Sequence, residues 1–332
     1  MKSDGNLLKA LWKAGFNDTD DYINLFFKML YKKGNAVYKK QGEEIISALY
    51  LLPFNMSFNG YIVKTAYLCG AATLPEYRGK GLMSELMNTA IKRLADDNIP
   101  FCTLIPANEG LFDYYSRFGF ADIYKTKKIR VKREEFDKKS LITFDKIDNA
   151  KEITDLYNNE IGRKDFAHLR TKEYFEFLLK EAELLNGKVL KIIKNNEFCG
   201  YMFCFCDFIK EFVLKNITFD EYAAAAFKYL KMEELEFVTP FDFSYEDGAV
   251  KRAGMLRIID CEKVLNLWAE KMPQKSHIIS VADKQIEKNN GVFKIEKGKV
   301  SRTDEKAEVK TDIKDLANMI ADSSPYINLS LN

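Results

Sequence analysis

A hydrophobic strand, a glycine loop and an amphipathic helix follow one another in this chain and constrain its fold most. Residues 62–74 are mostly apolar, β-branched or aromatic, as in a buried strand. Pro75 ends that strand, because proline lacks the amide hydrogen that a sheet ladder needs. Apolar residues then recur every three or four positions over 82–94, which predicts a helix. The sequence therefore predicts a loop, with Gly79 and Gly81, that opens a helix.

This loop has the properties of a pyrophosphate site. The first turn of a helix leaves amide NH groups unpaired and carries the positive end of the helix dipole. Arg78 and Lys80 add positive charge. The spacing fits neither a nucleotide P-loop nor a dinucleotide fingerprint, whose third glycine would fall at Ser84. The alternative to a phosphate site is a plain glycine turn on a basic surface.

The loop resembles the acyl-coenzyme A loop of the GCN5-related N-acetyltransferases, the GNAT family. That family's pattern is Arg or Gln, any two residues, Gly, any residue, then Gly or Ala. Arg78 and Gly81 match it, and Met83 stands where the small residue is expected. The resemblance implies these cofactor-binding residues: Ala72, Thr73, Leu74, Arg78, Gly79, Lys80, Gly81, Leu82, Met83, Ser84 and Asn108.

A second motif follows the next predicted strand, at 101–105. Asn108 is a predicted helix N-cap, and Gly119 a predicted left-handed residue at the end of that helix. An Asn after the strand, a Tyr late in the helix and then Gly-Phe resembles the other half of the GNAT site. The resemblance implies that Tyr115 is the general acid and that Asn108 lies beside the pantetheine arm. The alternative for Tyr115 is a core aromatic residue, as its neighbour Tyr114 could be.

Composition places the chain among ordinary globular proteins. It has 332 residues, enough for two domains or three small ones, with 47% hydrophobic and 30% charged residues. A net charge of +2 demands neither nucleic acid nor a membrane surface as a partner. No apolar run approaches the roughly 18 residues of a membrane span, and residues 1–5 lack a signal-peptide layout. We therefore expect a cytoplasmic protein.

The cysteines favour the same compartment and argue against a metal site. The six lie mostly in apolar runs, where a free thiol behaves as a small hydrophobic group. Cys199, Cys204 and Cys206 are close together, but no Cys-x-x-Cys pair exists, and His168 and His277 lie far away in sequence. We expect no metal.

The remaining elements predict an α/β (α+β) fold. Asp18 to Asp21 begins a helix, and this acidic start could also line an entrance for cationic substrates. Hairpin turns are predicted at 41–42 and 59–60, and a closing strand at 124–131. This order over residues 6–133 matches a GNAT domain. Further predicted helices are 150–159, 171–185, 222–230, 264–268 and 313–321; further predicted strands are 189–193, 198–206, 235–238, 255–259, 277–281, 291–295 and 307–310.

The whole layout resembles the enhanced intracellular survival (Eis) branch of the GNAT family. It implies tandem GNAT-like domains, each a mixed sheet flanked by helices, at 1–133 and, without a phosphate loop, at 134–254. Residues 255–332 would form a small lobe like sterol carrier protein. Enzymes of that branch acetylate amines of aminoglycosides or lysine side chains with acetyl-CoA and assemble as homo-oligomers. They use the C-terminal carboxylate in the active site, here that of Asn332.

The expected mechanism follows from the needs of acetyl transfer. The amine must lose a proton before it attacks the thioester, and the departing thiolate must gain one. Tyr115 would protonate the thiolate, while the weakly basic Asn332 carboxylate would hold the ammonium group or relay its proton. A backbone NH near Thr73 and Leu74 would stabilise the oxyanion. Two alternatives are a protein that binds coenzyme A or a lipid without turnover, and an acyl or aminoacyl transferase with another donor.

Overall fold

The structure, a computed structural model, describes residues 3–136, 140–245, 248–321 and 325–328. The helices are α1 (Asp4–Phe16), α2 (Asp20–Met29), α3 (Leu82–Asp96), α4 (Glu109–Ser116), α5 (Ala150–Glu160), α6 (Lys172–Leu184), α7 (Phe219–Leu230), α8 (Cys261–Ala269) and α9 (Ile313–Ile320), with 3-10 turns η1 (Pro75–Tyr77), η2 (Arg133–Phe136) and η3 (Glu287–Asn289). The first strands are β1 (Ala36–Gln41), β2 (Glu44–Phe58), β3 (Tyr61–Thr73), β4 (Phe101–Leu104), β5 (Ala121–Lys132), β6 (Ile142–Lys146), β7 (His168–Leu169) and β8 (Lys188–Lys194). They are followed by β9 (Glu197–Phe205), β10 (Phe208–Leu214), β11 (Glu234–Pro240), β12 (Ala249–Ile258), β13 (His277–Ala282), β14 (Gly291–Glu296), β15 (Lys299–Arg302) and β16 (Val309–Asp312).

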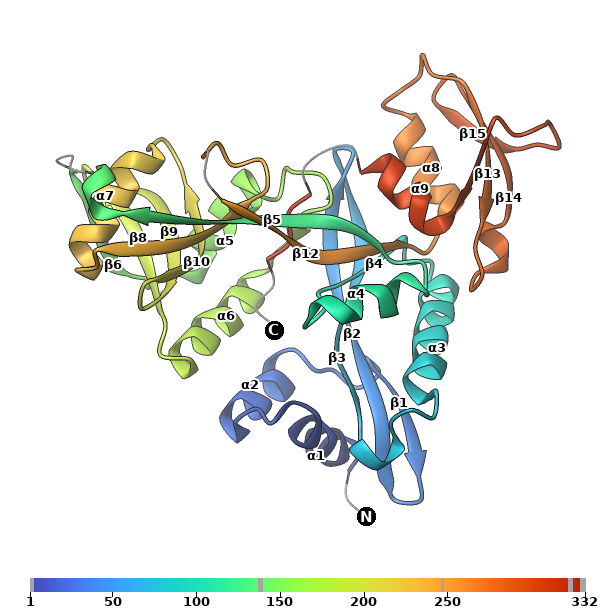
Figure 1. Ribbon diagram of the computed structural model, residues 1–332, viewed down its shortest axis with the longest axis horizontal. Helices are drawn as coiled ribbons and strands as arrows, with labels where there is room; N and C mark the ends of the chain where they lie inside the picture. The colour runs from blue at the N-terminus through green and yellow to red at the C-terminus, as the bar shows by residue number, and fades with distance from the viewer. Residues whose placement is uncertain (1–2, 137–139, 246–247, 322–324, 329–332) are drawn as a thin grey trace.

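One mixed sheet runs through most of the described chain. Its strand order is β1-β2-β3-β4-β12-β5-β11-β10-β9-β8-β6, with β7 paired to β2. A separate four-stranded sheet has the order β15-β14-β13-β16. Figure 1 shows the large sheet crossing the middle of the molecule and the small sheet with α8 and α9 to one side. A mixed α/β fold is therefore confirmed.

The N-terminal part follows its sequence closely. Thr19 caps α2, its side chain accepting a hydrogen bond from the Tyr22 amide at 3.2 Å. The turns at Gly42 and at Asn59–Gly60 join β1, β2 and β3 as predicted, with positive φ at all three residues. Pro75 begins η1 directly after β3. The predicted elements of this part are confirmed.

Strand β12 corrects one prediction. It lies between β4 and β5, pairing Met255 with Leu104 on one side and Leu256 with Ala121 on the other. The predicted strand 124–131 therefore does not close the sheet, since β5 has β12 and β11 as neighbours. The domain boundary expected between residues 254 and 255 stays a prediction; β12 spans that position. Local sequence patterns do not show which distant strands will pair. The insertion of β12 between β4 and β5 was therefore not predicted.

The middle of the chain adds the left half of Figure 1. Helices α5, α6 and α7 and strands β8, β9 and β11 agree with prediction, but β6, β7 and β10 were not predicted. Strand β10 follows β9 through a tight turn that contains Cys206 at φ 54°. A cysteine with positive φ is uncommon, so the sequence at Cys206 does not predict a turn. Strand β11 then pairs with β5, so the large sheet continues into this part of the chain. We call the part from β6 to β11 the middle lobe.

A buried ion pair joins the small sheet to the large one. Arg257 on β12 donates hydrogen bonds to Asp283 Oδ1 and Oδ2 at 2.7 and 2.9 Å, and both side chains are fully buried. Gly119 lies against this arginine: a Cβ there would be 1.8 Å from Arg257 Nη1. The Gly-Phe part of the second motif therefore has a packing role, and Gly119 takes φ 78° as predicted.

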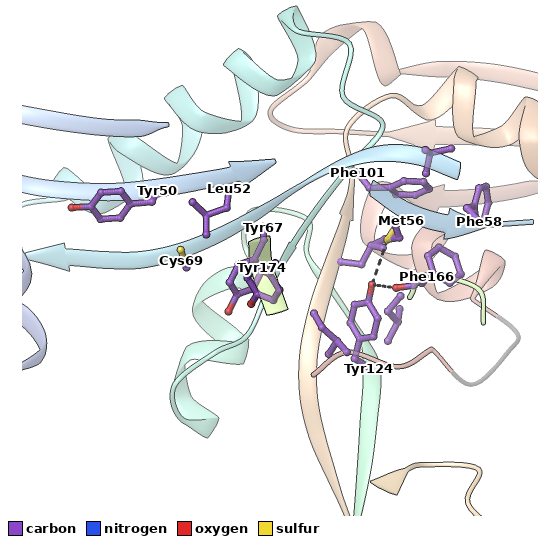
Figure 2. Packing of buried hydrophobic residues seen from close by; sticks show 14 of the residues in the cluster. Tyr50, Leu52, Met56, Phe58, Tyr67, Cys69, Phe101, Tyr124, Phe166 and Tyr174 are labelled. Atoms are coloured by element: carbon purple, nitrogen blue, oxygen red, sulfur yellow. Dashed lines mark hydrogen bonds between the residues drawn. The ribbon is translucent and has the colours of Figure 1, made fainter. Parts of the chain in front are cut away.

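The main hydrophobic cluster includes residues from every part of the chain. Figure 2 shows a portion of it around β2 and β3, where Tyr174 of α6 lies beside Tyr67. Tyr124 donates a hydrogen bond to the Phe166 carbonyl at 2.9 Å, which ties β5 to the loop before β7. In the part of the chain that the structure describes, no helix is long and apolar enough to cross a membrane.

Candidate active site

The glycine loop connects the end of β3 to the first turn of α3. Gly79 and Gly81 have φ of 76° and 77°, and a Cβ on either would meet no atom within 4 Å. Both positions favour glycine because their φ angles are positive. The empty space around them leaves the loop surface open for a ligand. Arg78 folds back, its Nε donating to the Thr73 carbonyl at 3.0 Å, and Lys80 Nζ lies 4.9 Å from the Tyr77 ring centre. The half-buried Met83 packs on a hydrophobic cluster and so finds room.

Strand β3 has an open edge beside this loop. It pairs in parallel with β4 from Thr65 to Leu68, where β4 ends, and beyond that point no described residue pairs with this edge up to Thr73. A bulge interrupts its pairing with β2, because Gly70 and Ala71 together lie opposite one β2 residue. Gly70 has φ 59°, with Trp12 and Tyr50 packed against it. Backbone groups of this bulge therefore lie where an extended ligand could run along the strand.

Helix α4 carries Tyr115 and lies against the start of α3. Its N-cap is Asn108, as predicted, but the exposed Asn108 side chain makes no capping hydrogen bond. Tyr114 Oη is 3.4 Å from Ser84 Oγ in the first turn of α3. This contact places the tyrosine helix next to the glycine loop. The two motifs therefore lie side by side in space.

Tyr115 lines a cavity of about 510 Å³ at the open edge of β3. The walls come from the α1–α2 connection, the bulge of β3, the chain after β4, α4 and α6 of the middle lobe. The lining residues are Trp12, Phe16, Asn17, Asp18, Thr19, Tyr22, Tyr67, Leu68, Cys69, Gly70, Ala71, Leu104, Ile105, Ala107, Leu111, Tyr115, Glu181 and Leu185. Their charged members are Asp18 and Glu181, so among the described residues the lining is acidic.

The ionisation states follow from burial. Tyr115 is 8% exposed, and burial raises its pKa to about 12, with smaller contributions from Tyr114 and Cys69. Burial likewise raises the pKa of Tyr22 and Tyr67 above the usual tyrosine range. These phenols are therefore protonated and neutral at physiological pH. The Asp18 carboxylate accepts a hydrogen bond from Trp12 Nε1 at 2.8 Å, which fixes its position at the cavity wall.

Two sequence predictions about the site need comment. The Leu74 amide donates to the Ile46 carbonyl at 3.0 Å, so it is not open to stabilise an oxyanion; the β3 bulge is the better candidate. Asn332, the predicted carboxylate residue, lies outside the described residues. Of the predicted cofactor residues, 72–74 lie at the end of β3, 78–81 in the loop and 82–84 in the first turn of α3, with Asn108 before α4.

Sequence reasoning missed the bulge and the Glu181 carboxylate. Gly70 interrupts an apolar strand, which is a recognised bulge signal that could have located the first. Glu181 lies in a helix of the middle lobe, 66 residues beyond Tyr115, and no local pattern connects it to the site. Among the residues that the structure describes, no group of three or more His, Cys, Asp or Glu side chains could hold a metal ion.

Comparison with known proteins agrees with this geometry. Residues 2–123 match the acetyltransferase (GNAT) domain family. The chain has a GNAT acetyltransferase domain. Membership of this domain family implies an acetyl-CoA-dependent N-acetyltransferase, with acetyl-CoA as co-substrate. The glycine loop, the edge of β3 beside it and the Tyr115 cavity all lie within or beside this domain.

Solved structures resemble the chain over nearly its whole length. A conserved protein of unknown function from Enterococcus faecalis, described as a probable N-acyltransferase, has a TM-score of 0.80 at 19% identity, covering 95% of this chain and 86% of that one. Eis1 from Mycobacterium abscessus has a TM-score of 0.75 at 14% identity, covering 97% and 88%. A GCN5-related N-acetyltransferase from Anabaena variabilis scores 0.75 at 15% identity, also covering 97% and 88%. The GNAT-domain chain thus shares its fold with Eis-like structures, while no curated protein matches its sequence.

Proposed function

We propose that this enzyme transfers the acetyl group of acetyl-CoA to a primary amine of a cationic acceptor. The acceptor class is an aminoglycoside-like or polyamine-like small molecule, or a lysine side chain. One observation supports this most: the cavity that contains Tyr115 is lined by the carboxylates Asp18 and Glu181. Opposite charges attract most strongly where water is scarce, and Glu181 is only 4% exposed. An ammonium group would therefore be held close to Tyr115.

The first motif fits the co-substrate. The open NH groups at the start of α3, with Arg78 and Lys80 nearby, would bind the pyrophosphate. The unpaired edge of β3 would hold the pantetheine arm, which leads the thioester to the bulge at Gly70. The Asn108 side chain makes no capping hydrogen bond, so its amide would be available to bind that arm. The bulge amides would then stabilise the oxyanion.

Each proton and bond in the transfer has an assigned place. The acceptor ammonium loses one proton to solvent through the acidic wall, and its nitrogen then forms a bond to the thioester carbonyl carbon. The carbon–sulfur bond breaks, and the Tyr115 hydroxyl donates its proton to the departing sulfur. The attacking nitrogen loses its second proton to water, and the Tyr115 phenolate regains a proton from water, so one proton in total is released to solvent. The products are an N-acetyl amine and free coenzyme A.

Several features remain predictions from the sequence. They are the assistance of the Asn332 carboxylate, the likeness of the middle and last parts of the chain to a second GNAT domain and a sterol-carrier lobe, a homo-oligomeric state and a cytoplasmic location. Since β12 belongs to the large sheet, we propose that the last lobe begins after Ile258 rather than at residue 255.

Acceptor turnover tests the proposal. Free thiol released from acetyl-CoA is followed with polyamines, aminoglycosides and lysine peptides, using wild type, Asp18→Asn and Glu181→Gln. We expect one class to be acetylated and Glu181→Gln to raise KM for the amine about tenfold, since one charge contact is lost. Lys228→Gln, on an exposed site of α7, is the control. Turnover of neutral amines that is indifferent to both substitutions would contradict the proposal.

A further inference from the structure

A second cavity lies at a gap in the edge of the large sheet. Strands β1 and β7 both pair with the same edge of β2, β1 as far as Tyr50 and β7 from Asn55 onward. No described residue pairs with that edge over residues 52–54, where Pro53 has no amide hydrogen to donate. A cavity of about 770 Å³ lies beside this gap, lined by the end of α2, the middle of β2 and the start of α6. We call it the edge cavity.

The edge cavity is separate from the cavity that contains Tyr115. The two have no lining residue in common. Helices α2 and α6 line both cavities, but with opposite ends. Tyr22 near the start of α2 and Glu181 near the end of α6 line the Tyr115 cavity, whereas Met29 and Tyr174, from the other ends of the same helices, line the edge cavity.

Much of the edge cavity's lining is apolar. Leu52 is 3% exposed, and the ring of the half-buried Phe54 lies 5.0 Å from the Tyr174 ring, edge to face at 82°. Met29 and Leu30, at the end of α2, also line the cavity. Such a surface suits the hydrocarbon part of a ligand.

Three lining residues have buried polar atoms without a hydrogen-bond partner. The atoms are Asn35 Nδ2, Arg170 Nε and Tyr174 Oη, out of seven such side-chain atoms among the residues that the structure describes. Arg170 and Tyr174 are 3% and 4% exposed. A buried polar group without a partner is unfavourable, and the two nitrogen atoms can only donate hydrogen bonds. A ligand that satisfies them must therefore carry hydrogen-bond acceptors.

Two lysines give the edge cavity a positive charge. Lys32 and Lys64 are exposed lining residues, and neither forms an ion pair with a described residue. The charge of Arg170 is already balanced by Glu211, at 2.6 Å. Glu173 is the one carboxylate in the described lining. The sign of the charge is therefore opposite to that of the Tyr115 cavity, and an anion is favoured.

We propose that the edge cavity binds an organic carboxylate with an apolar body, of the kind represented by a medium-chain fatty acid. The hydrocarbon part would pack on Leu52, Phe54 and the Tyr174 ring. The carboxylate would accept hydrogen bonds from the unpartnered donors, and Lys32 and Lys64 would attract it. The Tyr115 cavity does not suit such a ligand, because its lining carboxylates repel an anion. Binding at the edge cavity does not depend on the function proposed above.

Titration calorimetry of the full-length protein with sodium octanoate tests the proposal. Octan-1-ol and acetate are matched probes, since each has only one half of the ligand. We expect octanoate to bind at least about tenfold more tightly than either, because it alone uses both the apolar wall and the donors. Saturating coenzyme A should leave the Kd for octanoate unchanged, because the two cavities are separate.

Variants locate the site. Lys32→Gln combined with Lys64→Gln should raise the Kd for octanoate about fivefold, since two exposed charge contacts are lost. The matched control is Lys215→Gln combined with Lys228→Gln, which removes two exposed charges of the middle lobe and should leave the Kd unchanged. Tyr174→Phe keeps the ring but removes the hydroxyl, and should raise the Kd about tenfold.

The possible outcomes each decide the proposal. Octanoate that binds no more tightly than octan-1-ol or acetate would overturn the ligand class. Tight binding that neither the lysine pair nor Tyr174→Phe weakens, or that coenzyme A abolishes, would place octanoate elsewhere and overturn the site. Urea unfolding of each variant shows whether a raised Kd comes from a damaged fold; a loss of affinity seen only in unfolded variants would also count against the site.

Discussion

Tyr115 shows how single residues acquire chemistry from their surroundings. The pKa of about 12 that burial gives its phenol keeps the group protonated at every working pH, which suits a proton donor. The same burial is what a core aromatic residue would have, so the position in the Asp18–Glu181 cavity, rather than the pKa, favours a catalytic role. The motif predicted a role for Tyr115 from sequence, whereas only the three-dimensional structure brings Glu181 of α6 to the same cavity.

Gly70 permits a prediction at the same scale. Its φ of 59° disfavours any side chain, and a Cβ would be 2.6 Å from Trp12 and 2.7 Å from Tyr50. Gly70→Ala should lower the free energy of unfolding by about 3 kcal/mol, combining backbone strain and overpacking. Gly42→Ala, at φ 61° with no atom within 4 Å, should lower it by only about 1 kcal/mol. Urea denaturation measures both, and equal losses would show that the bulge is not tightly packed.

Among the elements, hairpins and helices were predictable and long-range pairing was not. Turns such as Asn59–Gly60 carry their own signal, and the α3 periodicity defines a helix face. Strand β10 was missed because its turn uses Cys206. A strand was predicted at 255–259, but not the place of β12 between β4 and β5, because these partners lie more than 100 residues earlier in the chain. The glycine loop that opens α3 was predictable, since its two glycines act through local backbone conformation.

The α3 loop gives a prediction that separates binding from stability. In Gly81→Ala, a residue that must take φ 77° should distort the loop, raising the Kd for coenzyme A about tenfold and costing about 1 kcal/mol of stability. The control is Gly60→Ala, in the distant β2–β3 turn. It should lower the free energy of unfolding by the same amount, because φ there is 81° and its surroundings are open. Calorimetric titration should find its Kd unchanged. A Kd for Gly81→Ala equal to that of wild type would argue against pyrophosphate binding at this loop.

The whole molecule is held together by strands shared between its parts. β12 completes the sheet of the GNAT domain, β11 pairs with β5, and β7 of the middle lobe pairs with β2. His168 on β7 lies fully inside this junction, with Nε2 2.8 Å from Thr103 Oγ1 on β4. Independent unfolding of the parts is therefore not expected.

His168 also makes stability depend on pH. Burial lowers its pKa to about 3, so between pH 6.5 and 3 the unfolded chain binds a proton that the folded one does not. Stability from this group is complete above pH 6.5 and falls as pH decreases, by about 2 kcal/mol at pH 5. In His168→Gln the difference between urea unfolding at pH 7 and pH 5 should shrink by that amount. An unchanged difference in His168→Gln would show that the imidazole is not held neutral.

The central claim is that Tyr115 donates the proton that coenzyme A needs on leaving. The most direct measurement is kcat for thiol release at saturating acetyl-CoA and amine, in wild type and Tyr115→Phe, with coenzyme A affinity measured in parallel. We predict a loss in kcat of at least about a hundredfold with coenzyme A affinity kept, and a wild-type rate that does not decline up to about pH 10 because the phenol stays protonated. A Tyr115→Phe enzyme with kcat within about threefold of wild type would contradict the claim and leave Tyr115 as a core aromatic residue.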